Sequence, residues 1–169
     1  MATLGNEEIS VVVPEELEDR VEVVETDLGS EIVVGKAVAG LEVNVDSGTT
    51  SAVAGKKVES STVSGKSEKG DTSKVVFQTT KVLDTEIVVK GKGAGDIKVN
   101  TGRFNNSSIT FKKKSADSVE FNNGVEVRNV TIDGGGGADT ITFASELTAS
   151  TVKGKGGADL ITVSGLVGT

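Results

Sequence analysis

The stretch IDGGGGADTITF, residues 132–143, places four consecutive glycines in front of Asp139 and a short alternating segment. Such a run is either a metal-binding loop or a tight corner in a chain that turns back on itself, because glycine reaches positive φ without the penalty of a Cβ. The sequence has no histidine and no cysteine. Only carboxylates, hydroxyls and lysines therefore remain for chemistry. We find no catalytic constellation and expect a protein that is not an enzyme.

Relatives of this stretch recur along the chain. GADTITF ends at Phe143, GADLITV ends at Val163, SADSVEF ends at Phe121, and a looser copy is GKGAGDIKV. The aspartates in these copies are separated by 21, 22 and 20 residues: Asp96, Asp117, Asp139 and Asp159. A unit this short cannot bury its own apolar face and must stack on copies of itself. With weaker matches upstream, the sequence predicts an all-β fold, a short parallel β-helix or β-roll of about seven coils with a period near 21 residues.

The composition agrees with strands joined by tight corners. Apolar residues make up 36% of the chain and are mostly aliphatic, since there are 5 Phe and neither Trp nor Tyr, and the chain has 22 Gly against 1 Pro. We expect residues 31–169 to form the repeat domain and residues 1–30 to be an N-terminal arm or a first coil. Residues 47–73, rich in Ser, Gly and Lys, contain the longest spacing and predict a protruding surface loop.

Charge and hydropathy restrict the partners. The formal net charge is -7, which disfavours nucleic acid, because binding to a phosphate backbone depends on Lys and Arg displacing counterions. No apolar run approaches the roughly 20 residues of a membrane span, and the first ten residues lack the pattern of a signal peptide. We therefore expect a soluble protein that binds neither nucleic acid nor membrane.

One copy of the repeat also matches a known motif. Residues 134–142, GGGGADTIT, carry each fixed position of G-G-x-G-x-D-x-U-x and resemble the nonapeptide of RTX (hemolysin-type) calcium-binding repeats. Residues 154–162 follow the pattern with Lys155 in place of the second glycine. In that family, glycine carbonyls and the aspartate hold calcium between corners stacked one coil apart. The resemblance implies one calcium site, at most two, formed by Gly134, Gly135, Gly137, Asp139, Gly154, Gly156, Gly157 and Asp159.

The chain also departs from that family. The nonapeptide occurs once per coil instead of twice, and lysines stand four residues before three of the aspartates: Lys92, Lys113 and Lys155. A lysine column beside the aspartate column would place ammonium groups where the cations stand, and calcium becomes optional. A purely structural corner, in which the carboxylates accept hydrogen bonds from backbone amides, explains the same residues. Both interpretations stay open at this point.

Two functional hypotheses follow. Small acidic Gly- and Val-rich β-proteins resemble decoration or knob proteins of tailed phages, including cyanophage-like ones, which implies a non-enzymatic structural protein on a viral capsid surface. Its partners would be a capsid or other virion protein and further copies of itself, met through an end or flat side of the β-helix, because open coil ends expose unpaired N–H and C=O groups. The alternative is a calcium-binding RTX-like module of a secreted or cell-surface protein.

Overall fold

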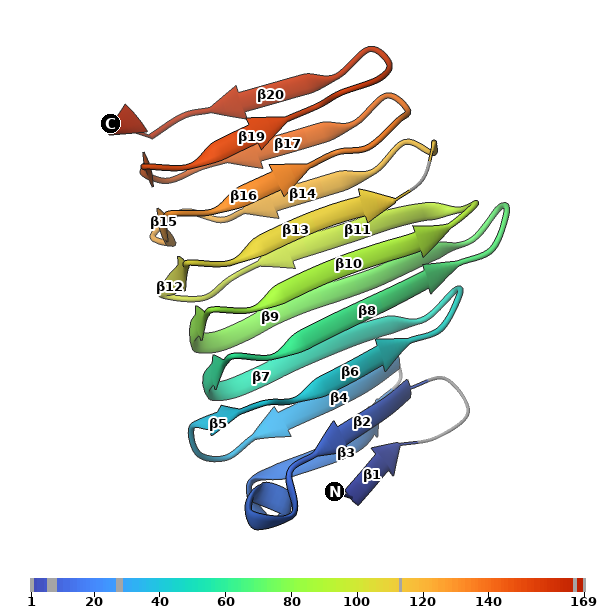
Figure 1. Cartoon of the computed structure of the whole chain (residues 1–169), viewed down its shortest axis with the longest axis vertical. Helices are drawn as coiled ribbons and strands as arrows, with labels where there is room; N and C mark the ends of the chain where they lie inside the picture. The colour runs from blue at the N-terminus through green and yellow to red at the C-terminus, as the bar shows by residue number, and fades with distance from the viewer. Residues whose placement is uncertain (1, 6–8, 27–28, 113, 166, 169) are drawn as a thin grey trace.

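The computed structural model describes residues 2–5, 9–26, 29–112, 114–165 and 167–168. These residues form an all-β parallel β-solenoid of about 6 turns with a period of about 22 residues. Figure 1 shows the coils stacked along one axis, from β1 at one end to β20 at the other. The predicted fold class is confirmed, with about one coil fewer than the sequence matches indicated.

The first face of the solenoid is an eight-stranded sheet. From β6 onward, adjacent strands of this sheet run parallel to each other. In spatial order the strands are β1 (Ala2–Gly5), β2 (Ile9–Val13), β6 (Glu42–Val45), β8 (Thr62–Ser67), β10 (Glu86–Gly91), β13 (Ser108–Lys112), β16 (Thr131–Asp133) and β19 (Thr151–Lys153).

A thirteen-stranded sheet supplies the other two faces. The second face consists of β4 (Gly29–Val34), β7 (Thr50–Glu59), β9 (Thr72–Leu83), β11 (Ala94–Val99), β14 (Ser118–Phe121), β17 (Thr140–Phe143) and β20 (Leu160–Val163). The third, narrower face contains the carboxyl-terminal parts of β7 and β9 together with β5 (Val38–Ala39), β12 (Arg103–Asn105), β15 (Glu126–Arg128), β18 (Leu147–Thr148) and β21 (Val167–Gly168).

Antiparallel strands close the N-terminal end. β1 pairs antiparallel with β2, β2 pairs antiparallel with β6, and β3 (Val21–Thr26) pairs antiparallel with β4 after the 3₁₀ helix η1 (Glu15–Arg20). Ile9, Val11 and Val13 on β2 are at most 1% exposed. The sequence did not decide whether residues 1–30 form an N-terminal arm or a first coil. In the structure, the described part of this segment covers the first parallel coil with antiparallel strands.

The predicted loop at residues 47–73 is wrong. This segment contains β7 and β8, which pair in parallel with coils on both sides. Val53, Val58 and Val63 point inward and are 1% exposed, while small inward residues such as Ser51 and Ser67 are completely buried. Because serine and glycine take several core positions here, the apolar alternation that marks a strand is weak in the sequence. The long spacing results from long strands, 10 residues in β7 and 12 in β9.

Equivalent residues of successive coils form the core. One column, in register from β6 to β16, is at most 1% exposed throughout: Val43, Val63, Ile87, Ile109 and Ile132. Aromatic rings continue from coil to coil in the middle of the solenoid. The Phe121 ring lies 5.3 Å from that of Phe104 in an edge contact and 4.9 Å from that of Phe143 in a stacked contact. Stacking of identical positions fixes the register, which in turn aligns the corners.

Candidate functional site

The glycine-rich corners lie one coil apart, as the repeat predicts. Residues 134–139 connect β16 to β17, residues 154–159 connect β19 to β20, and a parallel bridge joins Gly136 to Gly156. The Gly156 amide donates to the Gly135 carbonyl (3.1 Å), and the Gly137 amide donates to the Gly156 carbonyl (2.6 Å). The structure thus brings all eight predicted site residues into two stacked corners.

The aspartate of each corner explains the need for glycine. A Cβ on Gly134 would lie 2.6 Å from Asp139 Oδ2, because the carboxylate turns back under its own corner. A Cβ on Gly137, whose φ is +129°, would collide with the Ser115 carbonyl of the preceding coil. Glycine is therefore required both by the buried carboxylate and by the backbone of the neighbouring coil.

Three of the predicted aspartates form a hydrogen-bonded ladder. Asp117 Oδ1 accepts from the Gly95 amide (2.7 Å), Asp139 Oδ1 from the Asp117 amide (2.9 Å), and Asp159 Oδ1 from the Asp139 amide (3.1 Å). Asp117 and Asp139 are 3% and 1% exposed. Each carboxylate thus accepts a backbone N–H of the coil before it, which is the structural role that the sequence left open. We call these three residues the aspartate ladder.

Asp96 does not belong to the aspartate ladder. It is in register with Ser118, one residue beyond Asp117, and it faces outward on β11. There it forms an ion pair with Lys74 (3.6 Å) and accepts a hydrogen bond from the Ser118 hydroxyl (2.7 Å). The predicted column of four aspartates therefore has three members, and Gly95 takes the ladder position in the fourth coil.

The lysines named beside the aspartates have different environments. Lys155 forms an ion pair with Asp133, at the end of β16 in the preceding coil, and Lys92 is exposed at its corner. Lys113 lies outside the described residues. An in-register lysine column does exist, on the outer surface of the first face, and consists of Lys66, Lys90 and Lys112.

The donor set at the corners fits calcium poorly. Calcium takes six to eight oxygen ligands, several of them carboxylates. Among the described residues there is no group of three or more acidic side chains that could hold a metal ion. The carbonyls of Gly135 and Gly156 already accept backbone N–H groups of the adjacent coil. Asp133, at the end of β16, is held by Lys155 and by the Gly135 amide (3.1 Å). These contacts are those of a structural corner.

A second kind of corner, which the sequence analysis missed, borders the third face. One residue per coil adopts a left-handed conformation there, with φ between 47° and 52°: Ser60, Asp84, Asn106, Asn129 and Ala149. The next residue is often Ser or Thr. The Ser107 hydroxyl, for example, donates to the Asn105 carbonyl (2.8 Å) and accepts the Thr85 amide (3.1 Å) of the preceding coil. The signal in the sequence is one turn-forming residue before a hydroxyl, repeated at the coil period.

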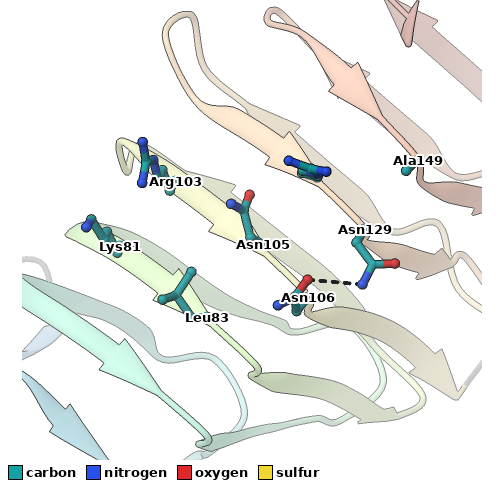
Figure 2. A pocket seen from close by; sticks show the side chains of 8 residues that line it. Lys81, Leu83, Arg103, Asn105, Asn106, Asn129 and Ala149 are labelled. Carbon is teal, nitrogen blue, oxygen red and sulfur yellow. Dashed lines mark hydrogen bonds between the residues drawn. The ribbon is translucent and has the colours of Figure 1, made fainter. Parts of the chain in front are cut away.

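A hollow of about 530 Å³ lies between these corners and the third face. We call it the basic hollow. Figure 2 shows the side chains that line it: Lys81, Leu83, Arg103, Asn105, Asn106, Arg128, Asn129 and Ala149. The Asn129 side-chain amide donates to Asn106 Oδ1 (3.0 Å), so that two equivalent corners are joined by their side chains. Arg103 Nε forms an ion pair with Glu126 Oε2 in the adjacent strand (2.8 Å). The lining contains three cations and no carboxylate.

Among the described residues, no strand covers the last coil of the solenoid, and we call this side of the coil the open end. Among the described strands, β20 pairs only with β17, and β19 pairs only with β16. Ile161 is in register with Ile141, but it is 43% exposed where Ile141 is 1% exposed, and Leu160 beside it is 60% exposed. This end therefore presents apolar side chains and the edges of the parallel strands β19 and β20, whereas the edges at the N-terminal end belong to the antiparallel strands β1 and β3.

No protein-family model matches this chain, and neither a curated protein nor a solved structure matches it. The class of the protein therefore comes from its own geometry, that of a parallel β-solenoid. Within the described residues, no helix has both the length and the apolar character needed to cross a membrane.

Proposed function

We propose that this β-solenoid is a non-enzymatic structural protein that attaches to a larger particle through its open end. The observation that carries the proposal is the exposure of Leu160 and Ile161 on the last described coil, at 60% and 43%. Exposed apolar side chains together with unpaired strand edges form a surface that another protein covers favourably. A viral capsid is the particle that we favour, and the protein would then lie on the virion surface as a homo-oligomer, a homodimer or homotrimer.

Purified virus particles from the source of the sequence provide the test. The protein should sediment with the particles through a density gradient at a fixed copy number, measured by quantitative mass spectrometry. A Leu160→Lys/Ile161→Lys variant should lose most of this incorporation, because two charges would have to be desolvated at the contact. Val24→Lys on β3, at the covered end, is the matched control, since Val24 is also an exposed apolar residue, at 37%.

Two results would refute this function. One is a protein that is absent from washed particles at every stage of assembly. The other is a Val24→Lys variant that loses incorporation as completely as the variant at the open end, since attachment would then not depend on β20.

The alternative function is that of a calcium-binding module of a secreted or cell-surface protein. The stacking of two corners that resemble RTX repeats favours it, whereas the donor set described above does not. Thermal unfolding in EGTA and in millimolar calcium separates the two functions. A calcium module melts at a much lower temperature in EGTA, because an ion that binds only the folded state stabilises that state, and a structural corner melts at the same temperature in both. Size-exclusion chromatography with light scattering under the same two conditions reports the number of associated copies.

A further inference from the structure

The basic hollow concentrates positive charge on a chain whose net charge is -7. Lys81 on β9 and Arg103 on β12 are in register, and Arg128 on β15 is in register with Asn105. Three successive coils thus each contribute one cation to the lining of the hollow, and Figure 2 shows Lys81 and Arg103 on neighbouring strands. Like charges on adjacent strands repel each other. Negative charge in the hollow would relieve this repulsion.

The cations of the hollow are only partly neutralised by the protein itself. Arg103 is held by Glu126, but in the part of the chain that the structure describes no carboxylate lies within ion-pair distance of Lys81 or Arg128. On the second face the arrangement is different, since Lys74 is paired with Asp96 and Lys98 with Glu120. A free guanidinium in a hollow can form a paired, charge-assisted contact with a carboxylate or sulfate group.

The remaining polar groups of the hollow suit a ligand that carries hydroxyls. Three asparagine amides line it, at positions 105, 106 and 129, and each amide offers both a donor and an acceptor. The hydrogen bond between Asn129 and Asn106 uses one donor and one acceptor of this pair and fixes the two side chains relative to each other. Leu83 and Ala149 are the only apolar residues of the lining. Peptide side chains and nucleic-acid bases, which rely on apolar or stacking contacts, are therefore poorly matched.

Nearby carboxylates indicate which part of the hollow an anion would occupy. Asp84 stands in the same left-handed column as Asn106, one coil earlier, and its amide donates to the Asn105 carbonyl (3.2 Å). Its negative charge disfavours an anion near β9. Glu126 is occupied by Arg103. The most favourable position is thus beside Arg128, between the amides of Asn106 and Asn129.

We propose that the basic hollow binds an acidic saccharide, with a carboxylate or sulfate group against the Arg128 guanidinium and hydroxyls on the Asn106 and Asn129 amides. The volume of about 530 Å³ is within the range of small-ligand sites, about 300–1,000 Å³. The affinity is modest, because the hollow is open and its apolar lining is small. This binding is separate from attachment through the open end.

Calorimetric titration of the full chain tests the proposal with three oligosaccharides of equal length: an oligouronate, a sulfated oligoglucan and the neutral oligoglucan. At least one acidic saccharide should bind about tenfold more tightly than the neutral one, which corresponds to about 1.4 kcal/mol. Arg128→Gln should remove this preference. Lys90→Gln is the matched control, because it removes the same charge from an exposed lysine on the first face and should leave the affinity unchanged.

A second variant separates saccharide binding from attraction of any anion. Asn129→Gly keeps the left-handed backbone, which glycine adopts readily, and removes the amide. This variant should bind the acidic saccharide several-fold more weakly, whereas its weak binding of inorganic sulfate should be unchanged. Comparison of the uronate with the sulfated glucan identifies the acid group.

The proposal is overturned by any of three results: equal affinity for neutral and acidic saccharides, including no binding of either at millimolar concentration; equal losses in Arg128→Gln and Lys90→Gln; or an oligoglutamate peptide that binds more tightly than both acidic saccharides.

Discussion

The aspartate ladder predicts a large stability loss for Asp139→Ala. Asp139 is 1% exposed, and its Oδ1 accepts the buried Asp117 amide at 2.9 Å. Removing the carboxylate leaves that N–H without its acceptor, at a cost of about 1–3 kcal/mol. Removal of the carboxylate also leaves a cavity beside Gly134, which lowers the free energy of unfolding by about 1 kcal/mol more. We therefore expect the free energy of unfolding to fall by about 2–4 kcal/mol. Asp139→Asn keeps a carbonyl acceptor and should lose less.

Urea unfolding, followed by far-ultraviolet circular dichroism, measures this loss. Asp96→Ala is the matched control, because Asp96 lies outside the ladder and its ion pair with Lys74 is partly exposed, so its loss should stay below about 1 kcal/mol. Each variant is measured in EGTA and in calcium. The reasoning fails if Asp139→Ala is no more destabilising than Asp96→Ala. A loss that occurs only in the presence of calcium would assign the ladder to metal binding instead.

Three further predictions concern the core, the second corner and an outer ion pair. Phe121→Ala empties the centre of the aromatic contacts and should lower the free energy of unfolding by about 3–5 kcal/mol; a loss below that of a typical surface variant in urea titration would contradict the packing. Ser107→Ala removes the acceptor of the Thr85 amide and should cost about 1–2 kcal/mol, measured by the same titration, whereas an unchanged midpoint would refute the role of the hydroxyl. The pKa of Lys98 is raised above 10.5, chiefly by its hydrogen bond with Glu120. The stabilisation from this ion pair is therefore complete below pH 10.5 and is lost as the pH rises through the pKa of the folded state. The difference in stability between the wild type and Lys98→Met should be largest near pH 9 and should shrink as the pH rises above 10.5; a difference that stays constant would contradict this origin.

The repeat made the fold predictable from the sequence. Similar heptapeptides around Asp117, Asp139 and Asp159 gave the period, and the parallel register of β14, β17 and β20 confirms that these segments stack. The glycines of both corners were also placed correctly, since steric demands on glycine leave a direct trace in the sequence.

The register of Asp96 could not be found by matching residue types. In that coil Gly95 donates to the ladder through its backbone N–H, which every residue other than proline has, and Asp96 faces outward. Because successive residues of a strand point to opposite faces, a shift of one position moves a side chain from the ladder to the outer surface. The alignment that matched aspartate to aspartate therefore chose the wrong face.

The basic hollow had no comparable signal. Lys81 and Arg103 occupy equivalent positions but differ in residue type, and Arg128 lies two positions further along its coil, in register with Asn105. A search for repeated letters does not find a property that depends on such a set of residues in neighbouring strands. The Asn106 and Asn129 corners could have been found, because their spacing follows the coil period.

The two unlike ends of the solenoid limit how copies of this protein can associate. Stacked parallel strands with two open ends would add one molecule after another and grow into a fibre. Here the antiparallel strands at β1, β2 and β3 close one end. Two molecules that met at β20 would each turn this antiparallel end outward. A third molecule would meet the edges of β1 and β3 there, which do not match the parallel edge at β20. Growth of a fibre by head-to-tail stacking of parallel coils is therefore disfavoured.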